Sequence, residues 1–132
     1  MNAFRRLIAA ILIALTATLA AGVPSAHAAT STTACFRWSN NTAYANQPMQ
    51  LWRTDSTGRL ISLQRSGRTN ASGCGTFSNT PSNMYLRAVA QYNSPAVYGH
   101  YDHWEGFSPR IATPGSGAAN LGTGYVYYVW SI

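Results

Sequence analysis

The stretch Met84-Tyr85-Leu86-Arg87-Ala88-Val89-Ala90-Gln91-Tyr92 alternates between two kinds of side chain. Its even-numbered positions, from Met84 to Tyr92, are all apolar or aromatic, whereas Arg87 and Gln91 lie among the odd-numbered ones. Side chains of a β-strand point alternately to its two faces, so a repeat of two indicates a strand with one drier face. We therefore predict a strand over 84–92 that packs this face on a core.

Short runs of β-type residues occur on both sides of this stretch, separated by Gly, Pro, Asn, Asp and Ser. They predict further strands at 34–38, 49–54, 59–64, 74–78 and 125–132. The run 125–132 is apolar or aromatic on both faces, which predicts a strand that is central or covered on both sides. Residues 66–73 are predicted as loop, and 93–124 as mainly loop with possible short strands at 96–101 and 109–113. The pattern predicts an all-β fold, a small antiparallel β-sandwich of about seven strands.

The first 28 residues have the order of a secretory signal peptide. Arg5 and Arg6 precede an apolar run from 7 to 22, and Ala26-His27-Ala28 forms a small-residue cleavage site. The rival interpretation, a transmembrane anchor, needs about 20 apolar residues, and this run is shorter. We expect cleavage after Ala28, a secreted product, a single domain over 29–132 and no transmembrane segment in it.

Charge is scarce in this chain, at 9% of residues against about 25% in an average domain. All nine cations are arginine, and Asp55, Asp102 and Glu105 are the three acids. Removal of residues 1–28 takes two arginines away and leaves a net charge of +4. So small a charge on a secreted domain argues against specific nucleic-acid binding.

Cys35 and Cys74 are the two cysteines. In a secreted chain such a pair predicts one structural disulfide. The alternatives are a metal pair or a catalytic thiol, but no C-x-x-C spacing supports a metal site. The bond would close a loop of about 40 residues and contribute roughly 4 kcal/mol.

One family resemblance is carried by three segments: Thr69-Asn70-Ala71-Ser72-Gly73-Cys74-Gly75-Thr76-Phe77, Asn79-Thr80-Pro81 and Tyr85-Leu86-Arg87-Ala88. Together they resemble the transthyretin-like sandwich pattern, which is similar to that of carboxypeptidase regulatory domains, over about residues 49–92. The resemblance implies a seven-stranded sandwich that acts as a binding or scaffolding module, usually without catalysis. No functional residue carries over, because the matching positions are structural ones.

The segment 98–107 concentrates the scarce ionisable groups and predicts the contact surface. Its candidate binding residues, with Arg110 beside them, are Tyr98, His100, Tyr101, Asp102, His103, Trp104 and Glu105. We interpret the segment as a solvated loop whose exposed rings suit a sugar or a protein partner. If it were a strand, His100 and Asp102 would share one face and His103 and Glu105 the other, so one metal ion could not collect all four. We therefore predict no metal and no cofactor.

Catalysis has little support in the sequence. Asp102 and Glu105 are the conceivable acid–base pair, and Ser108 is a conceivable nucleophile beside a histidine, but no nucleophile-elbow motif is present. A domain this small also offers little cleft to enclose a substrate. We expect a protein that is not an enzyme, with a small secreted hydrolase as an alternative.

Four arginines, Arg53, Arg59, Arg65 and Arg68, fall on and beside one predicted hairpin. Arginine binds phosphate and carboxylate groups in bidentate fashion, so this basic edge suits an anionic polymer or a membrane surface. The simpler interpretation is that charged edge residues guard a sheet against aggregation. The overall prediction is a secreted binding module for an extracellular polysaccharide or a protein partner, with a secreted inhibitor or toxin as a further alternative.

Overall fold

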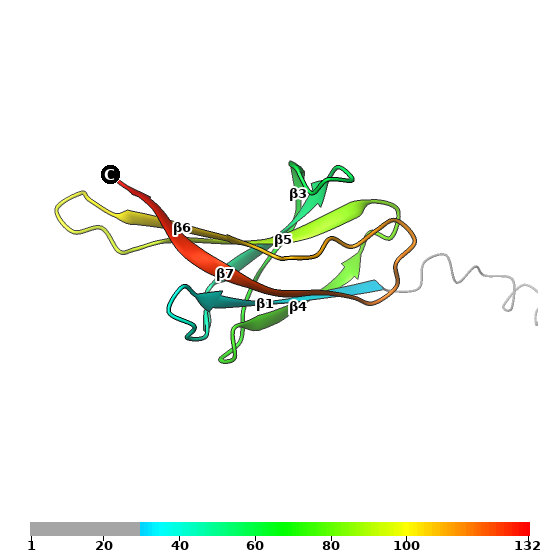
Figure 1. Cartoon of the computed structure of the whole chain (residues 1–132), viewed down its shortest axis with the longest axis horizontal. Coiled ribbons are helices and arrows are strands. Elements are labelled where there is room, and N and C mark those ends of the chain that lie inside the picture. The colour runs from blue at the N-terminus through cyan, green and yellow to red at the C-terminus, as the bar shows by residue number, and fades with distance from the viewer. Residues whose placement is uncertain (1–29) are drawn as a thin grey trace, which may run out of the picture.

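The computed structural model describes residues 30–132, and this part of the chain folds as strands, without a helix. The predicted signal peptide, 1–28, lies outside the described residues. The seven strands, shown in Figure 1, are β1 (Thr30–Trp38), β2 (Pro48–Thr54), β3 (Leu60–Arg68), β4 (Cys74–Thr80), β5 (Tyr85–Asn93), β6 (Asp102–Phe107) and β7 (Ala119–Ser131). No helix in this region has the length and hydropathy to cross a membrane. The predicted all-β class is confirmed.

The strands form a nearly closed sandwich in the order β3-β2-β5-β6-β7-β1-β4. Neighbouring strands are antiparallel except for β1 and β7, which run parallel from Thr32 opposite Ala119 to Trp38 opposite Val126. The two edge strands, β3 and β4, approach each other where Arg65 Nη2 donates to the carbonyl of Asn79 at 3.0 Å. The sheet therefore curls around one core with its edges almost joined.

The core lies on the inward faces of the strands. Leu86, Ala88 and Ala90 of β5 are buried, and Tyr92 packs against the same cluster. This confirms the alternation predicted for 84–92 with one exception, since Val89 on the opposite face is also fully buried. Phe36 of β1, Leu51 of β2 and Val126 of β7 supply inward side chains from the other strands, and each is fully buried.

The disulfide between Cys35 and Cys74 is confirmed. Cys35 lies directly opposite Cys74 in the antiparallel pair of β1 and β4. A tight turn delivers Cys74 to this position, because Asn70 Oδ1 accepts the backbone N–H groups of Ser72 and Cys74 at 2.9 and 3.1 Å. Gly73 has a φ of 80°, and a Cβ there would lie 2.4 Å from the carbonyl oxygen of Phe36, so only glycine fits the turn.

Several sequence predictions about strand positions were wrong. Residues 119–124 belong to β7, although they were predicted within the loop-rich region 93–124. Residues 102–107 are strand β6 and not loop, and β3 continues through residues 66–68, which were predicted as loop. The possible strands at 96–101 and 109–113 are reduced to single bridges, Val97 with His100 and Ala112 with Leu86. In each case, whether the segment forms a strand depends on a turn or on a pairing partner that is distant in sequence. Neither produces a local pattern of polar and apolar residues that could be read from the segment itself.

Strand β7 is central in the sheet, between β6 and β1, as predicted for the run 125–132. Its outward side chains are not covered by the described chain, however: Tyr125, Tyr127 and Val129 are 41%, 58% and 46% exposed. The end of β7 and the turn between β5 and β6 also project beyond the end of β1 (Figure 1). This projection leaves the inward faces of the long strands open at one end of the sandwich.

Candidate functional site

An open pocket of about 510 Å³ lies at that end of the sandwich. We call it the aromatic pocket, and it is lined by Trp38, Ser39, Asn40, Thr42, Tyr92, Ser94, Asp102 and Trp104. Trp38 is the last residue of β1, Tyr92 is the penultimate residue of β5, and Trp104 lies near the start of β6. All three side chains continue the inward face of their strand past the point where the core ends, so their rings meet solvent.

The rings of the aromatic pocket pack edge to face around Trp38. Its indole lies 5.2 Å from the ring of Tyr92 and 5.7 Å from that of Trp104, with interplanar angles of 84° and 83°. Beneath it, the ring centroid of Tyr44 lies 4.9 Å away. Edge-to-face pairs at these distances add about 0.5–1.5 kcal/mol each to the area that they bury. The wall of the pocket is therefore fixed in place by the core.

Tyr44 anchors this wall from inside the molecule. Its side chain is fully buried, and its hydroxyl donates towards the carbonyls of Pro48 at 2.9 Å and Gln91 at 3.2 Å. Burial raises the pKa of the Tyr44 phenol well above its usual value, because an ionised oxygen there would lose its water. Tyr44 thus acts as a neutral support for Trp38.

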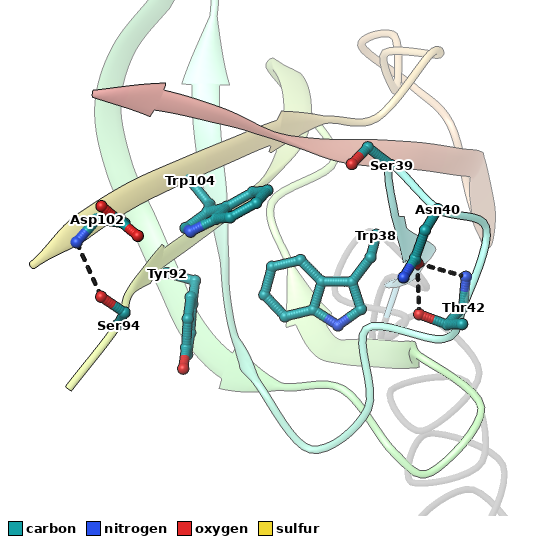
Figure 2. Close-up of a pocket in the computed structure, with 8 residues that line it drawn as sticks. All are labelled: Trp38, Ser39, Asn40, Thr42, Tyr92, Ser94, Asp102 and Trp104. Atoms are coloured by element: carbon teal, nitrogen blue, oxygen red, sulfur yellow. Dashed lines mark hydrogen bonds between the residues drawn. The ribbon is translucent and has the colours of Figure 1, made fainter. Parts of the chain in front are cut away.

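Polar groups stand at two opposite margins of the rings (Figure 2). At one margin, Asn40 Oδ1 accepts the backbone N–H and the hydroxyl of Thr42 at 3.1 and 2.7 Å. Both bonds use the oxygen, so the Nδ2 group of Asn40 is available as a donor. At the other margin, the backbone N–H of Asp102 donates to Ser94 Oγ at 2.8 Å, which ties β5 to β6 beside the pocket.

The Asp102 carboxylate accepts a hydrogen bond from the end of a chain of two hydroxyl groups. Ser131 Oγ donates to Asp102 Oδ1 at 2.5 Å, and the Tyr128 hydroxyl lies 2.7 Å from Ser131 Oγ. Ser131 has one hydroxyl proton and gives it to the carboxylate, so Tyr128 must donate to Ser131. The Tyr128 ring packs on Trp104 at 5.6 Å, so this chain also joins the carboxylate to the aromatic wall.

The predicted contact segment does not form one surface, because it is a strand whose residues alternate between faces. Asp102 and Trp104 point to the aromatic pocket, whereas His103 and Glu105 point to the opposite face of β6. His103 Nε2 lies 2.9 Å from Glu105 Oε1, and its ring stacks on Trp130 at 4.7 Å. The faces assigned for the strand alternative are therefore observed for Asp102, His103 and Glu105, whereas His100 lies before the strand begins.

The other candidate residues lie away from the pocket lining. Tyr98 is 97% exposed in the turn between β5 and β6, and His100 lies in the same turn. Tyr101 follows that turn, with its ring 5.8 Å from that of Trp130. Arg110 follows the other end of β6 by three residues, its backbone N–H donates to Leu121 O, and it does not line the pocket.

The basic edge divides into two parts. Arg65 binds the Asn79 carbonyl on β4, and Arg68 Nη1 donates to Asn46 O at 3.1 Å, so these two side chains hold the edge strands and a neighbouring turn. Arg53 and Arg59 are exposed on and beside the same hairpin. Because β3 is an edge strand, this arrangement fits the interpretation of arginine as edge protection.

The three carboxylates occupy three separate places in the described chain. Asp55 Oδ1 closes the turn between β2 and β3 by accepting from Thr57 Oγ1 at 2.6 Å and from two backbone N–H groups. Asp102 and Glu105, the conceivable acid–base pair, lie on opposite faces of β6. Within residues 30–132 no group of three or more His, Cys, Asp or Glu side chains could share a metal ion.

Ser108, the conceivable nucleophile, is buried and engaged in the backbone. Its Oγ accepts the N–H of Ala88 at 3.1 Å and donates to Arg110 O at 2.9 Å. No histidine takes part in these bonds. The position of Ser108 is therefore structural.

Sequence reasoning missed six of the eight residues that line the pocket: Trp38, Ser39, Asn40, Thr42, Tyr92 and Ser94. Both rings were assigned to strands, and rings in strands were expected to fill the core. A usable signal was their position at the end of a predicted strand, Trp38 in 34–38 and Tyr92 in 84–92. An inward side chain at a strand end has core on one side only, so its other side is open to a ligand.

The chain has little similarity to known proteins. No protein-family model matches it, and no curated protein matches it. Among solved structures it is similar to a crystal structure of a 9R-lipoxygenase from Cyanothece PCC8801, with 16% sequence identity and a TM-score of 0.45. The similarity covers 80% of this chain and 18% of the lipoxygenase chain. This similarity supports no conclusion about function, and the transthyretin-like resemblance stays a prediction.

Proposed function

We propose that this domain is a secreted, non-catalytic module that binds carbohydrate in the aromatic pocket. The observation that carries the proposal is the position of Trp38, Tyr92 and Trp104, whose rings line one open pocket between two polar margins. Binding pockets for small ligands combine an apolar or aromatic wall with a few polar groups that set orientation. The aromatic pocket has this composition.

A sugar ring matches such a site on two counts. Its C–H face is apolar and packs on an aromatic ring, and its hydroxyl groups need hydrogen-bond partners at the rim. The Asn40 Nδ2 group supplies a donor at one margin, and the Asp102 carboxylate supplies an acceptor at the other. The disulfide suits an oxidising compartment, which supports secretion as part of the proposal.

Titration calorimetry with a panel of soluble oligosaccharides, and pull-down on insoluble polysaccharides, tests the proposal. Trp104→Ala removes one wall of the pocket and should weaken binding about tenfold, since a stacked ring contributes about 1.5 kcal/mol. Trp130→Ala is the matched control, because Trp130 lies opposite His103 on the neighbouring strand and faces away from the pocket. Its affinity should equal that of the wild type.

Two results would contradict the proposal. One is a wild-type protein that binds no member of the panel. The other is equal affinity for Trp104→Ala and the wild type, with both folded by circular dichroism, because the ligand would then bind elsewhere.

A further inference from the structure

Two side-chain carboxylates of the described chain form no ion pair, Asp55 and Asp102, and of these Asp102 lines the aromatic pocket. Asp55 is taken up by hydrogen bonds within its turn, and Glu105 pairs with His103. Asp102 forms no ion pair within residues 30–132, although these residues hold seven arginines and three acids. An acid that lines a pocket and stays unpaired among so many cations is suited to a cation from outside.

The rings of the aromatic pocket favour the same kind of ligand. The face of an aromatic ring carries negative electrostatic potential, so Trp and Tyr faces attract ammonium groups. Elsewhere in the described residues, one ring has an arginine over it: Arg87 lies 5.1 Å from the centroid of Phe107, on the outer side of the sheet. No arginine lines the aromatic pocket, so its ring faces are left to a ligand.

The Asp102 carboxylate can accept a further hydrogen bond. The chain from Tyr128 through Ser131 ends on Oδ1, and every proton in it points towards the carboxylate. The carboxylate has about four acceptor sites when ionised. An N–H group of a ligand can thus bind it without displacing Ser131, and a charged donor makes the stronger bond.

From these observations we infer that the aromatic pocket recognises a sugar that carries a protonated amine. The inference rests on the carbohydrate-binding function proposed above and narrows its ligand to an amino sugar or a polymer of one. The amine would lie against Asp102, and the sugar ring would pack on Trp104. The whole chain is positively charged, so long-range repulsion opposes a cationic ligand and the recognition must come from the pocket itself.

The test compares three short oligosaccharides of equal length: a glucosamine oligomer, its N-acetylated form and a glucose oligomer. Titration calorimetry is run in a mildly acidic buffer in which the sugar amines are protonated. The glucosamine oligomer should bind at least about tenfold more tightly than the other two, because it alone adds a cation–aromatic contact and a charged hydrogen bond. Raising the salt concentration should reduce this preference, because salt screens the charge–charge part.

Asp102→Asn and Glu105→Gln form the matched pair of variants. Asparagine keeps the shape of Asp102 and still accepts from Ser131, so the fold should be retained while the preference for the amine is lost. Glu105 lies on the opposite face of the same strand, so its neutralisation should leave the preference unchanged.

The outcomes separate the two proposals. Equal affinity for the three oligomers would overturn the amino-sugar inference and leave carbohydrate binding in place. An unchanged preference in Asp102→Asn would overturn it as well, because the amine would then be recognised by another group. Failure of all three oligomers, together with the wider panel, to bind would overturn both proposals.

Discussion

Replacement of Cys35 and Cys74 by alanine measures how much the disulfide stabilises the sandwich. The bond joins two residues that face each other across β1 and the edge strand β4. Its cysteines are 39 positions apart, and in the chain-entropy model the closure of such a loop contributes about 4 kcal/mol. A domain of this size has a total stability of about 5–15 kcal/mol, so the double variant should remain folded with a reduced free energy of unfolding.

Urea unfolding followed by tryptophan fluorescence is the assay. Trp38 lies three residues after Cys35 and packs on the core, so its emission reports the loss of the pocket end. With a denaturant slope of about 2 kcal/mol per molar, a loss of 4 kcal/mol lowers the midpoint by about 2 M urea. The slope should also rise, because the unfolded chain expands once the bond is gone.

A second pair of residues on the same two strands is the control. Thr33 faces Thr76, and their hydroxyls lie 2.9 Å apart at an exposed position. Alanine at both positions should cost about 1 kcal/mol, the net value of an ordinary hydrogen bond. If the cysteine variant loses no more stability than this pair and keeps the wild-type slope, the loop-closure reasoning is refuted.

Two further predictions follow from burial and from a turn. Leu51→Ala empties a fully buried position and should lower the free energy of unfolding by about 2–5 kcal/mol in denaturant. Leu63→Ala, at a site 47% exposed, is the control and should change it by no more than about 0.5 kcal/mol. Equal losses in the two variants would contradict the assigned core. The hydroxyl of Thr57 and the backbone N–H of Arg59 hold the pKa of Asp55 below its usual value of 3.8. The ionised carboxylate therefore stabilises the fold above pH 3.8, the pKa of the unfolded chain. This stabilisation is lost as the pH falls through the lower pKa of the folded protein. The deficit of Asp55→Ala should therefore be largest near neutral pH and shrink in acid, as measured by unfolding free energies across that range, and a deficit independent of pH would exclude this role.

The faces of β5 could be read from the sequence because burial on one side of a strand leaves a repeat of two in the chain itself. Leu86, Ala88 and Ala90 are buried as that repeat predicts. The disulfide was equally readable, since two cysteines allow one pairing. The first prediction needs only a local pattern, and the second needs only the number of cysteines in the chain.

The partners of β6 and β1 could not be read in this way. Strand β6 is polar at His103 and Glu105, and it was interpreted as loop because polar residues prevail in loops as well as on the outer faces of strands. Its backbone groups are satisfied by β5 and β7, and the β7 residues that pair with it lie 20 or more positions further along the chain. The parallel pair of β1 and β7 joins residues still further apart. No local pattern states which strand will lie beside another.

Only two of the eight residues that line the candidate site were predicted, for a related reason. Asp102 and Trp104 were singled out because charge is scarce and that segment is rich in it, and both line the pocket. Their neighbours in the sequence, His103 and Glu105, were included by proximity along the chain, whereas a strand sends adjacent residues to opposite faces. The remaining wall, from Trp38 and Tyr92, comes from distant strands that the topology brings to the same end.

The same residues that line the aromatic pocket also complete the core, and this determines how the site must be studied. Trp38 contacts Tyr44, Tyr92 and Trp104 at once, so its removal would take away support for the whole pocket end together with one wall. A loss of binding in Trp38→Ala would therefore have two explanations. Trp104 contacts Trp38 on one side and Tyr128 near the C-terminus on the other, at the margin of the packed cluster. Because fewer packed groups depend on Trp104, a loss of affinity in Trp104→Ala with unchanged unfolding behaviour assigns the effect to the ligand and not to the fold.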